Sequence, residues 1–97
     1  MKTIWKLEIN FEDVQLVEMP HGSVPLKVGW DPHEKKAYLW VECDTRKDKM
    51  KCRVFVRDTG ENLDGVAGYY IGTVTYPSRV EPKLFQWHIY FNPEPVV

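Results

Sequence analysis

Several features are scarce in this sequence, and each scarcity excludes a class of protein. The 97 residues contain two cysteines, too few for the disulfide framework of a small secreted domain. No apolar run approaches the roughly 20 residues that a membrane-spanning helix requires. Charged residues interrupt the stretch from Met1 to Asn10, so we expect no signal peptide. These absences favour a cytoplasmic protein.

Net charge is also nearly absent. Thirteen Lys and Arg stand against fourteen Asp and Glu, which gives a net charge of -1, so no overall basic field attracts nucleic acid. The basic residues are nevertheless concentrated, because residues 46–57 hold six of them against Asp48 alone. The local excess of cations is balanced by an acidic remainder.

Helical periodicity is missing, whereas apolar and polar residues alternate with period two along most of the chain. Turn-forming residues separate seven such segments, which are Ile4–Phe11, Val14–Met19, Leu26–Trp30, Ala37–Cys43, Lys51–Arg57, Tyr69–Tyr76 and Leu84–Phe91. This pattern predicts a single all-β antiparallel domain over residues 1–97, either a small barrel or a two-sheet sandwich of about seven strands. One short helical turn fits within residues 61–66. The proline-containing tail, residues 92–97, is predicted not to extend a central strand.

Matching side chains across strands predicts two of the pairings. The first two segments form a hairpin that sets Ile9 opposite Leu16. The fourth and fifth pair with Cys43 opposite Cys52, which also brings Glu42 against Arg53.

Two further pairings follow in the same way. The third and fourth segments pair Val28 with Leu39 and Leu26 with Val41. The last two form a hairpin, joined through Pro77 to Lys83, with these opposed pairs: Tyr76 and Phe85, Val74 and Trp87, Gly72 and Ile89, Tyr70 and Phe91.

The Cys43–Cys52 register gathers one set of aromatic and basic side chains on the face away from the core. The set comprises Tyr38, Trp40, Lys51, Arg53, Phe55 and Arg57. Such a face is a second buried layer, a homo-oligomer interface or a binding surface. As a binding surface it predicts a protein partner or self-association. Rings interleaved with cations are also typical of single-stranded nucleic-acid binding, although the cross-strand carboxylates favour a solvated charged face instead.

No metal or cofactor site is predicted. Eight residues separate Cys43 from Cys52, which is not the spacing of a zinc knuckle, and we expect both thiols to be reduced and buried. No regular spacing relates the three histidines to them. His88 shares a face with Thr73 and is expected to be a partly exposed hydrogen-bonding residue.

One tripeptide raises the question of catalysis. Asp58-Thr59-Gly60 matches the motif of small aspartic proteases of retroviral type, in which two aspartates share a proton. Arg57 and Glu61 replace the apolar and small residues expected on either side, and the motif lies late in the chain. Because Asp-Thr-Gly is also ordinary turn chemistry, we expect a turn here and no enzyme.

A set of short motifs in order carries a family resemblance. They are Ile4-Trp5-Lys6, Val17-Glu18-Met19-Pro20, Leu39-Trp40, Thr59-Gly60, Tyr70-Ile71-Gly72-Thr73 and Trp87-His88. Together they resemble a family of small uncharacterised bacteriophage and prophage proteins across nearly the whole chain. Members often carry Gly-Thr-Gly-His where this chain has Asp58 to Glu61. The resemblance implies a phage-encoded protein acting in a bacterial host cytoplasm, with a host or phage protein as its partner. It implies no catalytic activity.

Overall fold

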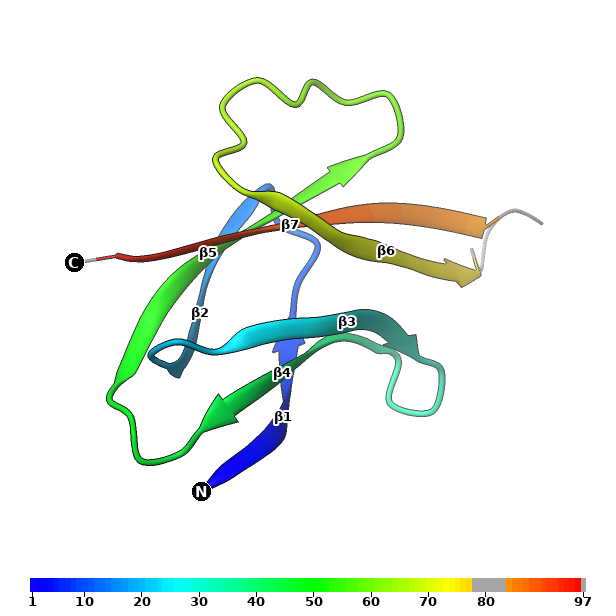
Figure 1. Ribbon diagram of the computed structural model, residues 1–97. Coiled ribbons are helices and arrows are strands. Elements are labelled where there is room, and N and C mark those ends of the chain that lie inside the picture. Colours follow the sequence, from blue (N-terminus) through cyan, green and yellow to red (C-terminus); the bar gives the residue numbers. More distant parts are fainter. Residues whose placement is uncertain (78–83, 97) are drawn as a thin grey trace.

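The computed structural model describes residues 1–77 and 84–96, which form seven strands and no helix (Figure 1). The strands are β1 (Lys2–Ile9), β2 (Val14–Pro20), β3 (Val24–Asp31), β4 (Lys36–Asp44), β5 (Lys49–Asp58), β6 (Tyr69–Pro77) and β7 (Leu84–Val96). The predicted connection from Pro77 to Lys83 lies, after its first residue, outside the described ranges. Residues 61–66 hold turns, with the Val66 N–H donating to the Leu63 carbonyl at 3.1 Å, in place of the short helical turn. Within the described ranges, no helix is long and apolar enough to cross a bilayer.

The strands form two antiparallel sheets, one in the order β1-β4-β3 and the other in the order β2-β5-β7-β6. The all-β prediction is therefore confirmed, in its sandwich form and not as a closed barrel. Alternating side chains from both sheets meet between them. The most completely buried, at 0% exposure, are Leu39, Val41, Val54, Val74 and Ile89. Removing each such side chain from water stabilises the fold by about 1.5–3 kcal/mol.

The predicted hairpin of the first two segments is wrong. β1 pairs with β4, so that Ile9 lies opposite Ala37, and β2 pairs with β5, so that Leu16 lies opposite Arg53. Consecutive strands thus enter different sheets, and Leu16 points outward instead of into the core. Alternation identifies which side chains face the core. It does not identify which strands pair, because two strands in opposite sheets show the same alternation as two neighbours within one sheet.

The predicted pairing of the fourth and fifth segments is wrong for the same reason, because β4 and β5 belong to different sheets. Cys43 lies opposite Thr3 and Cys52 lies opposite Val17. The two cysteines still belong to one buried cluster, since each strand turns the predicted apolar face inward. The cross-strand pair of Glu42 with Arg53 does not form.

The other two pairings are largely confirmed. Val28 lies opposite Leu39, but a bulge places Pro25 instead of Leu26 opposite Val41. In the last hairpin three of the four predicted pairs hold, and a bulge between Tyr70 and Gly72 moves the fourth, so that Tyr70 meets Tyr90 and Tyr69 meets Phe91. Extra residues of this kind carry no sequence signature that alternation alone detects.

The proline-containing tail does extend β7, contrary to prediction, since the strand continues to Val96 and pairs with Lys51 of β5. β6 begins at Tyr69, opposite Phe91. Residues after Phe91 therefore have a neighbour on one side only. Pro93 and Pro95 occupy an edge, where a missing N–H breaks no ladder.

The sandwich closes along the side where β3 packs against β6. A Cβ atom built on Gly72 would lie 2.8 Å from Val28 Cγ2, so the two strands approach more closely than a side chain permits. Trp30 of β3 stacks on Tyr76 of β6 with ring centroids 4.8 Å apart. Phe11 adds a further ring, 5.2 Å from Tyr76. Glycine and stacked rings together join the sheets on this side.

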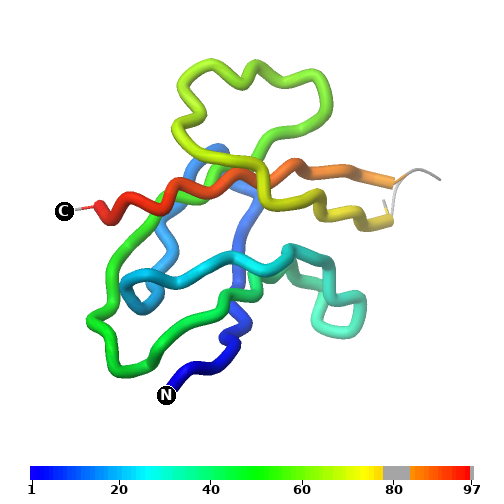
Figure 2. Tube along the Cα trace, viewed as in Figure 1, coloured from blue at the N-terminus to red at the C-terminus, as the bar shows by residue number. Residues whose placement is uncertain are grey.

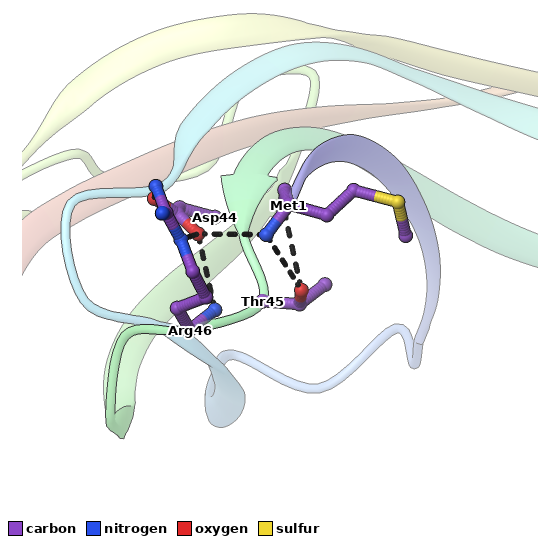
Figure 3. Close-up of polar contacts among 4 residues, drawn as sticks. All are labelled: Met1, Asp44, Thr45 and Arg46. Carbon is purple, nitrogen blue, oxygen red and sulfur yellow. Dashed lines mark hydrogen bonds and ion pairs between the residues drawn. The ribbon is translucent and has the colours of Figure 1, made fainter.

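The first residue is fixed to the end of β4 (Figure 3). The Met1 ammonium group lies 3.3 Å from Asp44 Oδ1 and donates to Thr45 Oγ1 at 3.3 Å. The Asp44 carboxylate also accepts two hydrogen bonds from the Arg46 guanidinium, at 3.1 and 2.9 Å. These contacts attach β1 to the connection that carries the chain from one sheet to the other.

Asp44 is expected to make the stability of the domain acid-sensitive. Hydrogen bonds from the Arg46 side chain and backbone, with the Met1 ammonium, hold the pKa of the Asp44 carboxyl well below its ordinary value of 3.8. Its contribution is therefore complete above about pH 4 and is lost as the pH falls through the lowered pKa of the folded state. Urea unfolding should show Asp44→Asn to be less stable than the natural protein at pH 6, with the difference shrinking at pH 2.5. Asp48→Asn removes the same charge from the same connection, and a similar pH-dependent difference there would contradict this assignment.

Candidate binding surface

The structure divides the six predicted site residues between two opposite surfaces. Tyr38 and Trp40 lie on the outer face of the three-stranded sheet. Phe55, with the three basic residues, lies on the outer face of the four-stranded sheet. They do not form one surface, because the pairing that would have joined them is absent.

Side chains from the same sheet and its connections pack around Tyr38 and Trp40. Tyr38 is 8% exposed and donates from its hydroxyl to Glu34 Oε2 at 2.8 Å, which raises the pKa of the phenol. The Lys6 ammonium lies 4.0 Å from the Tyr38 ring centroid, and that of Lys27 lies 4.7 Å from the Trp40 ring. Tyr38 is therefore covered within the chain, as a second buried layer would require, whereas Trp40 is half-buried.

The β5 residues fall into two groups. Phe55 is 6% exposed, and the Arg57 guanidinium lies 5.9 Å from its ring centroid. Arg57 also donates to the carbonyls of Asp13, at 2.6 Å, and Asn62, at 3.3 Å, so its role is to hold two connections in place. Lys51 and Arg53 are exposed and make no ion pair within 4 Å in the described part of the chain.

A row of apolar and aromatic side chains crosses this face from edge to edge. Strand register places Val14, Phe55, Tyr90 and Tyr70 side by side on β2, β5, β7 and β6. Val14 and Tyr70, at the two ends, are 48% and 52% exposed. Leu16, next to Val14 on the same face, is 52% exposed. We call these five residues the outer row, in which Phe55 is buried and Val14, Leu16 and Tyr70 are about half exposed.

A groove of about 730 Å³ runs beside the outer row, between the free edges of β1 and β2. Its apolar lining includes Leu7 and Val17 from the core side and Leu16 from the outer row. The polar lining consists of Glu8, Asn10, Glu12, Gln15, Glu18 and Arg53. We call this cavity the edge groove.

The Gln15 side-chain amide lies at one end of the edge groove and pairs with the backbone of Asn10. It accepts a hydrogen bond from the Asn10 N–H at 2.8 Å and donates to the Asn10 carbonyl at 2.6 Å. Both backbone groups are therefore satisfied by one side chain, as a neighbouring strand would satisfy them. This contact closes the groove where β1 ends.

His88 makes the hydrogen bonds expected of it. Its Nε2 lies 2.8 Å from Thr59 Oγ1 and its Nδ1 lies 3.1 Å from Thr73 Oγ1, and the Tyr70 hydroxyl continues the chain to Thr73. The network anchors the start of the connection between β5 and β6, which stands away from both sheets (Figure 2).

Asp58-Thr59-Gly60 forms the expected turn. The Glu61 N–H donates to the Asp58 carbonyl at 3.1 Å, and Gly60 has a φ of 90°, a conformation that glycine adopts readily. The Asp58 carboxylate accepts a hydrogen bond from the Thr59 N–H at 2.7 Å. The carboxylate thus caps its own turn.

Cys43 and Cys52 are free and buried, as predicted. Burial raises the pKa of both thiols, which keeps them protonated and unreactive. Within the described residues, no cluster of three or more His, Cys, Asp or Glu side chains is arranged to hold a metal ion.

Sequence reasoning missed the exposed members of the outer row and the acidic lining of the edge groove. One signal was present. Val14 and Leu16 alternate with Val17 and Met19, so β2 carries apolar residues on both faces, although one of those faces is open.

Comparison with known proteins identifies a family and no individual relative. Neither the curated proteins nor the solved structures contain a match to the chain. A family model described as a domain of unknown function (DUF7352) matches residues 1–97. The protein therefore belongs to this family of domains of unknown function.

Proposed function

We propose that the protein is a non-enzymatic protein-interaction module, and that the outer row with the adjoining edge groove is its binding surface. The observation that carries the proposal is the position of Leu16, Val14 and Tyr70. Each is about half exposed and all lie on one sheet face, where Val14 and Leu16 also line a groove of about 730 Å³.

The chemistry of this surface supports a protein partner. Exposed apolar residues next to one another are uncommon on monomeric proteins and mark interaction sites. Tyrosine and arginine, here Tyr70 and Arg53, are enriched among the residues that dominate binding energy. The sequence resemblance to phage and prophage proteins further supports a phage-encoded accessory protein that acts in a bacterial host cytoplasm.

Single-stranded nucleic acid is the competing partner for the same face. Tyr90 and Tyr70 extend the predicted ring set, and Lys51 and Arg53 are free to meet phosphate. However, Phe55 is covered and the two tyrosines pack edge to face with centroids 5.6 Å apart. Few ring faces therefore remain open for stacking, which favours a protein.

A hydrolase acting through Asp58 has the least support, because its carboxylate is bonded within its own turn. Asp58→Asn is expected to leave the function of the protein in cells unchanged.

Affinity capture from the bacterial cells that carry the gene, with nucleic acid retained, tests the proposal. Leu16→Asp is expected to reduce recovery of the partner at least tenfold, because it places a charge in an apolar contact. Val24→Asp, on the opposite face at 51% exposure, is the matched control and should retain the partner. Equal losses in both variants, or recovery of nucleic acid that falls steeply with salt, would refute a protein-binding outer row.

A further inference from the structure

The four-stranded and three-stranded sheets have several free edges, and all but one carry a recognised protection against pairing with another strand. β1 carries Lys2 and Lys6. β3 contains Pro25, Lys27 and a bulge. β6 is interrupted by a bulge and packs against β3. The free part of β7 contains Pro93 and Pro95.

β2 is the unprotected edge among the described strands. It has no lysine or arginine, its proline comes only at the last position, and its register with β5 is continuous from Val14 to Pro20. Glu18 is its one charged residue. A regular edge of this kind offers alternating N–H and C=O groups to any extended segment.

The edge groove beside β2 is suited to receive such a segment. Its volume of about 730 Å³ is within the range of about 300–1,000 Å³ typical of ligand sites. Leu7 and Val17 supply apolar contacts on the core side. The Gln15 amide already pairs both backbone groups of Asn10, at the end of β1, so the extended backbone of β2 is the part of the groove left for an added segment.

The charges lining the groove define the partner further. Three glutamates and one arginine line it. Glu8 already pairs with Lys36 at 2.8 Å. Glu12 and Glu18 are exposed and have no ion pair within 4 Å in the described part of the chain. Unpaired carboxylates beside an apolar groove favour cationic side chains on the occupant.

We infer that the edge groove binds an extended cationic segment of a partner protein, which adds to β2 as a further strand. Backbone hydrogen bonds along β2 provide affinity. Alternate side chains of the segment face the core side and pack on Leu7 and Val17, and its lysines or arginines, on the other face, approach Glu12 and Glu18. This inference rests on the proposed protein-binding function and specifies the chemistry of the partner.

A second copy of the chain is a poorer occupant. Pairing two β2 strands would bring together two grooves with the same acidic lining, and like charges at close range disfavour the contact. A cationic segment meets the carboxylates instead, although Arg53 lines the rim and Lys51 of β5 lies opposite Glu18.

Titration with synthetic peptides, followed by amide NMR and hydrogen exchange, tests the inference. The probe is a capped eight-residue peptide that alternates valine and lysine. We expect its resonance changes to map to the edge groove and the exchange of β2 amides to slow. Glu12→Gln with Glu18→Gln should weaken binding about three- to tenfold, in a salt-dependent manner. Leu16→Lys, which installs an edge-protecting charge, should weaken it more than tenfold.

Matched controls separate strand addition from general attraction. Glu42→Gln removes an exposed carboxylate from the opposite face and should not change the affinity. A peptide with alternate amide nitrogens methylated keeps its charge but loses donors and should bind at least tenfold more weakly. Equal binding of a valine–glutamate peptide, absence of binding at millimolar concentration, or sedimentation as a dimer that Leu16→Lys dissociates would each overturn the inference. If the peptides fail to bind while Leu16→Asp still abolishes capture of the natural partner, the proposed function stands and the strand-addition mechanism fails.

Discussion

Gly72→Ala is expected to lower the free energy of unfolding by about 3 kcal/mol, as two penalties act together. Gly72 has a φ of 153°, which other residues adopt only with strain. Its new Cβ would also lie 2.8 Å from Val28 Cγ2, so β3 and β6 would be forced apart. Chemical denaturation of the purified domain measures the effect.

Two further variants separate these penalties. Gly60→Ala also introduces a side chain at positive φ, 90°, but nothing lies within 4 Å of the new Cβ, so a loss of about 1 kcal/mol is expected. Val28→Ala removes the clashing methyl. Adding it to Gly72→Ala should therefore cost less than the sum of the single substitutions. Simple additivity would show that the contact between the sheets plays no part.

Phe91→Ala is expected to cost about 3–5 kcal/mol, a large share of the total stability of about 5–15 kcal/mol typical of small domains. Phe91 is 1% exposed and lies in β7 between Val54 and Tyr69. Its removal would leave a cavity that strands on both sides cannot easily fill. The urea midpoint and the melting temperature should fall together.

Phe91→Leu provides the conservative comparison, with an expected cost below about 1.5 kcal/mol. Tyr70→Ala removes an aromatic ring from the neighbouring strand where it is 52% exposed, and its effect on stability should be small by comparison. A loss at Tyr70 as large as that at Phe91 would mean that the outer row is structural and would weaken its assignment as a binding surface.

The strands could be predicted from sequence because alternation reports local backbone geometry and burial directly. The pairing of Gly72, Val74 and Tyr76 with β7 was also predictable. Strands that follow one another in the sequence and are joined by a short connection usually pair with each other. Which strands share a sheet was not predictable for β1, β2, β4 and β5. Cys43 lies on the apolar face of β4 and Cys52 on that of β5. These two faces match equally well whether the strands are neighbours in one sheet or face each other across the core.

The same limit applies to the candidate site. Tyr38, Trp40 and Phe55 were correctly placed on the outward faces of their strands, but only the sheet order reveals that they lie on opposite sides of the molecule. The edge groove depends on which strands remain unpaired. No local sequence pattern indicates which strand edges remain unpaired. The one related signal was that β2 carries apolar residues on both of its faces.

The separation of β1 and β2 into different sheets has a consequence for how the chain acquires its structure. Among the described strands, only β3–β4 and β6–β7 pair as hairpins of sequence neighbours. β1 pairs from Lys2 with Asp44, and β2 pairs from Val14 with Phe55, so each must close a long loop first. Such distant pairing is typical of folding in milliseconds to seconds. During synthesis at about 5–20 residues per second, the first twenty residues must wait several seconds for partners to emerge, with the unprotected strand β2 exposed throughout.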